Sequence, residues 1–278
     1  MTAESEGREA AERFRQDHRL GVQPLGDLVT IIEQAADIDV AVVDVEPNEH
    51  GMAMRDPARD VVFVAVARTP HPMRQRSTLA HELGHVLFGD WTDPGQERWG
   101  ERTREEVRAD AFARHLLAPA AGLRGFLGQH SPVGRATLSA VVQRFLVSPA
   151  IAAIALHDAG YIDEAVKNEW MGFTAHVLAA QFGWSDQYRA LQEESNRIRA
   201  PQRLLTRALQ GYLQNVVSVQ TLARLRGVAP EKIEAELNEA GLIPRQAEVI
   251  AWADSTDLPE VNVDLSDLGE ATATNPPE

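Results

Sequence analysis

Several features are missing from this sequence of 278 residues, and each absence excludes a class of protein. The chain contains no cysteine, which excludes disulfides, a thiol nucleophile and a cysteine-ligated metal site. It has no run of about eighteen apolar residues, and residues 1–19 lack the apolar core of a signal peptide. We therefore expect a cytoplasmic protein with no membrane partner.

Positive charge is also scarce in this chain. Lysine and arginine number 27 against 41 aspartate and glutamate residues, which gives a formal net charge of −14. A chain this acidic is poorly suited to broad electrostatic adhesion to DNA or to anionic lipid. It is nevertheless long enough to bury a sizeable core and to form two domains.

The most informative motif is His-Glu-Leu-Gly-His, residues 81–85. His81 and His85 are four residues apart, so on a helix they share one face and can hold one metal ion. Glu82 projects beside that ion, where its carboxylate can take a proton from water. The opposite face of the helix is apolar, and we expect it to be buried: Leu79, Leu83, Val86 and Leu87. The motif predicts the active-site helix of a zinc metallopeptidase.

A catalytic zinc ion needs a third protein ligand and an open position for water. Trp91 stands where one class of zinc peptidase has a third histidine, and the lack of cysteine excludes a thiolate ligand. A glutamate from a second helix remains. Glu106 and Asp110, about twenty residues after His85, are four apart and can point toward one site. Glu106 would bind zinc, and Asp110 would accept the outer ring N–H of a zinc histidine.

Two other glutamates compete with Glu106 for the third-ligand position. Glu105 is the main competitor and Glu101 a more distant one, since all three lie in an acidic cluster among arginines. Such a cluster is usually a solvated helix face. The histidine pair upstream favours Glu106, and the choice between Glu106 and Glu105 stays open at this point.

Two strings in the sequence together indicate a family. They are Thr-Leu-Ala-His-Glu-Leu-Gly-His and, after it, Glu-x-x-Ala-Asp-x-Phe-Ala-x-x-Leu-Leu-x-Pro. Over about residues 25–120 the chain resembles the ImmA/IrrE metallopeptidases. The resemblance implies a minimal zincin fold, zinc held by His81, His85 and Glu106, and Glu82 as the catalytic acid/base. It also implies a role in transcription regulation or stress response, with a helix-turn-helix repressor of the XRE type as the protein substrate.

The fold class that follows is α+β and predominantly helical, with a small β-sheet and the metal helix in the first half. Strand-like segments occur at 40–45, 51–55 and 61–66, after an apolar helical pattern at 25–36. The 61–66 strand, or its neighbour, could bind substrate as an added strand, although a central core strand is an equally good interpretation. The expected divisions are a polar arm, 1–24; a zincin-like metallopeptidase domain, 25–130; a helical C-terminal domain, 131–250; and an acidic disordered tail, 251–278.

The C-terminal half contains two segments with helix-turn-helix-like spacing. In the first, 138–160, the second helix has no arginine or lysine, so we do not expect it to contact DNA. The second, 219–232, carries Arg224, Arg226 and Lys232, so it is the segment best suited to contact nucleic acid or an acidic partner. Between them, a helical stretch has a predicted core of Trp170, Phe173, Val177, Leu178 and Phe182. The sequence does not indicate an oligomeric state.

Two functions are compatible with this pattern, and the acidic charge argues against a third, a transcription factor that uses the C-terminal helices. The leading one is a zinc endopeptidase that cleaves a specific regulatory protein. The alternative is a binding module in which zinc shapes a partner surface with little or no proteolysis. Glu82 favours the enzyme, because a purely structural zinc site would be closed by a fourth ligand. A further oxyanion donor would assist the reaction, and the candidates are His71, His115, His157 and Tyr161. We otherwise interpret His115 as a surface residue.

Overall fold

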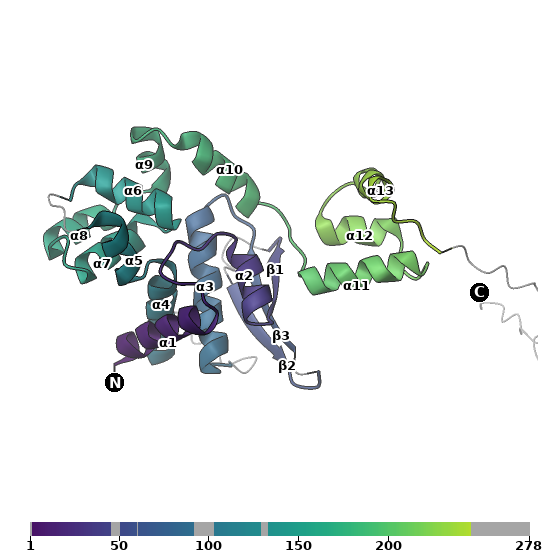
Figure 1. The fold of residues 1–278 in the computed structure, drawn as a ribbon, viewed down its shortest axis with the longest axis horizontal. Helices are drawn as coiled ribbons and strands as arrows, with labels where there is room; N and C mark the ends of the chain where they lie inside the picture. The colour runs from purple at the N-terminus through teal and green to yellow at the C-terminus, as the bar shows by residue number, and fades with distance from the viewer. Residues whose placement is uncertain (1, 46–50, 60, 92–102, 129–132, 246–278) are drawn as a thin grey trace, which may run out of the picture. The chain divides into compact units, whose positions relative to one another are not determined.

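The computed structural model describes most of the chain (Figure 1). It confirms an α+β, predominantly helical fold with one small mixed sheet in its described part. Glu101 and the predicted acidic tail, 251–278, lie outside the described residues. The described residues are 2–45, 51–59, 61–91, 103–128 and 133–245.

The sheet has three strands in the order β1-β3-β2. Their bounds are β1, Asp39–Val43; β2, Gly51–Asp56; and β3, Val61–Ala67. β3 runs parallel to β1 and antiparallel to β2, so it is the central strand. One face of the sheet is buried: Val40 pairs with Val64 and Val42 with Val66. Within the described residues nothing pairs with the outer edge of β2, whereas Val42 of β1 forms a bridge with Arg199.

Two helices cover the buried region beside the sheet. α2 (Leu28–Ala35) follows Asp27, whose carboxylate caps it by accepting the N–H of Thr30. α3 (Pro72–Phe88) carries the histidine motif and packs on β2 and β3. Its predicted apolar face is buried at Leu79 and Leu83. The expectation for Leu87 is wrong: this side chain is 44% exposed, because the last turn of α3 borders a surface hollow beside the N-terminal helix.

Helix α4 (Arg104–Leu117) lies between α3 and the N-terminal helix α1 (Ala3–Asp17), in contact with both (Figure 1). Small residues allow these close contacts. A Cβ added to Gly84 of α3 would lie 3.2 Å from the Cα of Ala109, and one added to Gly7 of α1 would lie 2.4 Å from the carbonyl oxygen of Arg108. The segment that the sequence indicates as a polar arm therefore contributes a tightly packed helix.

A buried arginine fastens α1 to the end of α4. The Arg15 side chain is 4% exposed. Its Nε donates to the carbonyl oxygen of Leu116 at 2.8 Å, and its Nη1 donates to that of Gly21 at 2.8 Å. These acceptors replace water around the charge, and the Leu116 carbonyl belongs to the negative end of the α4 dipole.

Most of the remaining helices extend the same core: α5 (Ala120–Leu127), α6 (Arg135–Phe145), α7 (Pro149–Asp158), α8 (Glu164–Met171), α9 (Ala175–Gln181) and α10 (Ser185–Ser195). α6 and α7 are bent by 109° at a short break, within the range of about 90–120° of helix-turn-helix pairs. In the described residues no single helix has both the length and the apolar character to cross a membrane; only α6 and α7, counted as one bent pair, reach that level.

The predicted core between the two helix-turn-helix-like segments is only partly correct. Trp170 and Leu178 are buried, whereas Val177 and Phe182 are 39% and 41% exposed. Helix α9 is a short helix of 7 residues, and only one side of it is covered. The periodicity of the sequence overestimates how much of such a short helix is buried.

The last three described helices share a small core of their own. They are α11 (Gln202–Leu213), α12 (Val219–Arg226) and α13 (Pro230–Glu239), and their core includes Leu222, Ile233 and Leu237. α12 ends at Gly227, whose φ of 62° is left-handed and suits glycine. Arg226, one of the basic residues of this segment, forms an ion pair with Glu236.

Candidate metal centre

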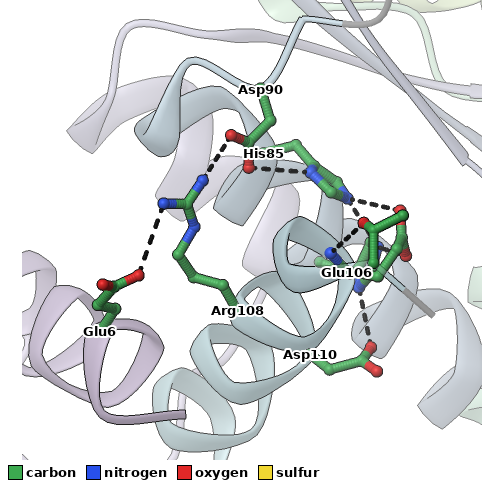
Figure 2. Close-up of polar contacts among 8 residues, drawn as sticks. Glu6, His85, Asp90, Glu106, Arg108 and Asp110 are labelled. Atoms are coloured by element: carbon green, nitrogen blue, oxygen red, sulfur yellow. Dashed lines mark hydrogen bonds and ion pairs between the residues drawn. The ribbon is translucent and has the colours of Figure 1, made fainter. Parts of the chain in front are cut away.

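The facing sides of α3 and α4 bring two imidazoles and a carboxylate together (Figure 2). Nε2 of His81 lies 2.9 Å from Nε2 of His85. The two carboxylate oxygens of Glu106 lie 3.2 Å from Nε2 of His81 and 3.5 Å from Nε2 of His85. In the described part of the chain, these three residues are the group of donors placed to hold a metal ion.

The outer nitrogen of each imidazole faces a carboxylate. Nδ1 of His81 is 3.0 Å from Asp110, and Nδ1 of His85 is 3.4 Å from Asp90. An ionised carboxylate only accepts hydrogen bonds, so each one favours the tautomer with the proton on Nδ1, and in the neutral ring Nε2 then keeps its lone pair. Two lone pairs and the charge of Glu106 thus converge on one point. A cation bound there would relieve their mutual repulsion.

The structure distinguishes between the two neighbouring glutamates of α4. Thr103 caps the helix by accepting the N–H of Glu106, and the Glu106 side chain then faces α3. Glu105 is exposed, and hydrogen bonds from its own backbone and from Thr103 lower the pKa of its carboxyl group. Glu106, and not Glu105, is therefore the glutamate in the cluster with the histidines.

Glu82 lies beside the cluster, in a largely covered position. Burial raises the pKa of its carboxyl group to about 7; the charge of His81 opposes this shift and that of Glu106 adds to it. Gly51, at the start of β2, is its close neighbour. A Cβ on Gly51 would lie 2.9 Å from Oε1 of Glu82 and 2.5 Å from Cγ2 of Thr78, so a larger residue here would have to displace these side chains.

The two histidines differ in their proton affinity. Burial lowers the pKa of His81, but the hydrogen bond and charge of Asp110 and the charges of Glu82 and Glu106 outweigh burial and raise it above 6.5. For His85, burial and the charge of His81 dominate and lower the pKa. His85 is thus readily neutral, as a metal ligand must be. His81 lies among acidic groups, and these groups would also attract a metal cation.

Asp90 and Arg108 are two further residues of the site, and the sequence motifs predict neither of them. Asp90 accepts a hydrogen bond from Nη2 of Arg108 at 2.6 Å as well as facing His85 (Figure 2). The signal for Asp90 was present, since it follows Gly89 directly after the metal helix. Nothing in the spacing of α4 indicates that Arg108 reaches it.

The side chains considered as oxyanion donors have their contacts elsewhere in the described chain. His71 lies at the start of α3, His157 contacts Asp158 and Glu164, and the Tyr161 hydroxyl donates to the carbonyl oxygen of Gly128. His115 is not the surface residue that we expected. Only 13% of its side chain is exposed, because α1 covers it and Glu4 contacts its ring at 3.0 Å.

The family comparison agrees with this geometry. Residues 33–157 match the peptidase family model described as the IrrE N-terminal-like domain. Residues 33–157 therefore form an IrrE N-terminal-like domain. The match contains the whole cluster of His81, His85 and Glu106, and it confirms the resemblance that the two sequence strings indicated.

A curated relative of the IrrE-like domain carries the same indication. Over 107 residues the chain is 36% identical to the radiation response metalloprotease IrrE of Deinococcus radiodurans. The alignment covers 36% of this chain and 32% of that protein, so the chain matches about a third of the relative's length. Both comparisons support a metallopeptidase-like role for the IrrE-like domain.

Proposed function

We propose that this protein is a zinc-dependent endopeptidase that hydrolyses a peptide bond in a specific regulatory protein. In this proposal His81, His85 and Glu106 hold the zinc ion, and Glu82 is the catalytic acid/base. One observation carries it: both Nε2 atoms and the Glu106 carboxylate point at one spot while Asp110 and Asp90 hold the outer nitrogens.

The donor set and its spacing fit zinc. Two imidazole nitrogens and one carboxylate are a common protein ligand set for catalytic zinc, which keeps a fourth position for water or substrate. Ligand atoms at about 2.0–2.1 Å from a tetrahedral ion lie about 3.3 Å apart. The separations in this cluster, 2.9, 3.2 and 3.5 Å, are close to that value.

In the proposed reaction, the zinc ion and Glu82 have separate roles. When bound, zinc would acidify a water molecule and polarise the scissile carbonyl. Glu82 then accepts the proton of the attacking water and delivers it to the leaving nitrogen, as a general base and afterwards a general acid. Its place next to His81 in α3 and its covered environment support this role, since they keep the carboxylate close to the reacting atoms.

One edge of the sheet is suited to bind the substrate chain. β3 is paired on both sides, whereas the outer edge of β2 is unpaired within the described residues. β2 begins at Gly51, which abuts Glu82. An extended peptide that paired with β2 would therefore pass the catalytic carboxylate, and its backbone would supply the hydrogen bonds of an added strand.

The proposed substrate is a helix-turn-helix repressor of the XRE type. This part of the proposal rests on the family resemblance. The experiment is co-expression with a candidate repressor of this type from the same genome, followed by mass spectrometry of the repressor. The wild-type protein should produce a shortened repressor. Glu82→Gln should bind zinc as the wild type does and leave the repressor intact, because an amide cannot act as a base.

The outcomes of this experiment separate the two candidate functions. Cleavage by Glu82→Gln at the wild-type rate would contradict the catalytic role of Glu82. An intact repressor whose activity changes equally with both proteins would instead support a zinc-containing binding module without proteolysis.

A further inference from the structure

The end of α3 places Asp90 next to His85, which is a candidate metal ligand. Gly89 has a left-handed φ of 69°, and its N–H donates to the carbonyl oxygen of Val86 at 3.1 Å. The N–H of Asp90 donates to the carbonyl oxygen of His85 at 2.9 Å. These two bonds form a Schellman motif, which turns the chain back toward the last turn of the helix. The Asp90 carboxylate consequently faces Nδ1 of His85 at 3.4 Å.

Arg108 fixes the other oxygen of that carboxylate. Its Nη2 lies 2.6 Å from Oδ1 of Asp90, and its guanidinium carbon lies 4.0 Å from the centre of the Phe88 ring. The side chains of Asp90 and Arg108 are only 14% and 19% exposed. A charge-assisted hydrogen bond so shielded from water, with an aromatic ring beneath the cation, holds both groups in one orientation.

A residue of the N-terminal helix completes the chain of contacts (Figure 2). Oε2 of Glu6 in α1 lies 3.7 Å from Nη1 of Arg108, and its other oxygen contacts Arg104 at 2.5 Å. Gly7 permits this approach, because a Cβ there would meet the backbone of Arg108. Helix α1 precedes residue 33, where the match to the family model begins.

We propose that Glu6, Arg108 and Asp90 are positioning residues for His85, so that docking of α1 on α4 sets the affinity of the metal centre. This inference rests on the proposed zinc binding. A ligand histidine binds best when a partner on its other nitrogen fixes the ring. His81 has a simple partner in Asp110, which is half exposed. His85 instead depends on a shielded carboxylate that needs Arg108 to compensate its charge and hold its orientation.

The test is the zinc dissociation constant of the full chain, measured by competition with a chromophoric chelator. Arg108→Gln should weaken zinc binding about 10–100-fold, as loss of an outer partner typically does. Arg104→Gln is the matched control: Arg104 lies on the same helix and contacts the same Glu6, but not Asp90, and its side chain is 59% exposed. The zinc affinity of Arg104→Gln should stay within about twofold of the wild type, because Arg104 does not contact Asp90 and its own side chain is largely exposed.

A double-mutant cycle tests whether Glu6 of α1 affects zinc affinity through Arg108. Glu6→Gln alone should weaken zinc binding, by less than Arg108→Gln does. In the Arg108→Gln background the same substitution should have no further effect, because Glu6 acts through Arg108. The absorption spectrum of the cobalt-substituted protein should change in Arg108→Gln but not in Arg104→Gln, which separates a reoriented ligand from a general loss of stability.

The possible failures are distinguishable. Wild-type protein that binds no zinc would overturn both the proposed function and this inference. Wild-type protein that binds zinc, with Arg108→Gln equal to it, would overturn the inference and leave the proposed function in place. Affinity unchanged by Glu6→Gln would overturn the part assigned to α1.

Discussion

Each candidate metal ligand of this chain is hydrogen-bonded to a neighbouring residue. Asp110 and Asp90 face the outer nitrogens of the histidines, and Thr103 caps α4 by accepting the backbone N–H of Glu106. The sequence reveals Asp110, since it lies four residues after Glu106. It does not reveal that Arg108 reaches Asp90, because that contact depends on how α3 and α4 pack against one another and not on any spacing along the chain.

The choice between the neighbouring glutamates gives a residue-scale prediction. Glu106→Ala should weaken zinc binding by more than about 100-fold, since loss of a direct ligand exceeds the effect of losing an outer partner. Glu105→Ala should leave it nearly unchanged, because the Glu105 side chain is turned toward Thr103. Isothermal titration with zinc compares the two variants. Equal losses of affinity in both would contradict the assignment of Glu106.

At the scale of elements, the order helix, small sheet, metal helix, second helix follows from the sequence, and so do the approximate positions of all three strands. The register of the strands and the burial of α1 do not follow from the sequence. α1 is rich in charge, but its Gly7, Phe14 and Arg15 are buried against the rest of the chain, and neither the polar composition nor the periodicity of this segment indicates that contact. Close packing through a single glycine is visible only once both helices are placed.

Replacing a helical glycine with alanine should change stability in opposite directions at Gly7, where α1 contacts α4, and at Gly125 in α5. Gly7→Ala should lower the free energy of unfolding by about 1–3 kcal/mol, because its Cβ would overlap the backbone of Arg108. Gly125→Ala in α5 should raise it by about 0.5–1 kcal/mol, since nothing lies within 4 Å of its Cβ and alanine is the better helix former. Urea unfolding measures both. A stabilised Gly7→Ala variant would contradict the packing described for α1.

The cap of α2 predicts a dependence of stability on pH. Burial alone would raise the pKa of Asp27, but hydrogen bonds from Thr30 and Arg199 and the charge of Arg199 outweigh it, so the pKa lies below 3.8. A lowered pKa in the folded state means that the unfolded state takes up protons first as the pH falls. The stabilisation by the Asp27 charge is therefore complete above about pH 4 and is lost as the pH falls through the folded-state pKa.

The matched variant is Asp27→Asn, which keeps a good capping residue but removes the charge. It should be less stable than the wild type at pH 6, by less than about 1 kcal/mol because the pair with Arg199 is partly exposed. The difference should shrink toward zero as the pH falls below 3.8. Unfolding curves at several pH values test this, and a difference independent of pH would argue against the ion pair.

At the scale of the whole molecule, the IrrE-like segment 33–157 holds the candidate metal cluster, and α1 and the helices after α7 lie outside it. The sequence predicts the family and the helix-turn-helix-like bend between α6 and α7. The domain divisions, the cytoplasmic location, the absence of DNA contact and the repressor substrate stay predictions. They depend on partners and on cellular context, which neither a motif nor a packed core contains.

Zinc content after purification, measured by mass spectrometry of the metal, tests the metal centre directly. Zinc-supplied wild-type protein should retain about one ion per chain, and the double variant His81→Ala/His85→Ala should retain almost none, because two of its three protein ligands are lost. A folded, zinc-supplied wild type without the ion, or equal zinc in both proteins, would contradict binding between these two imidazoles and Glu106.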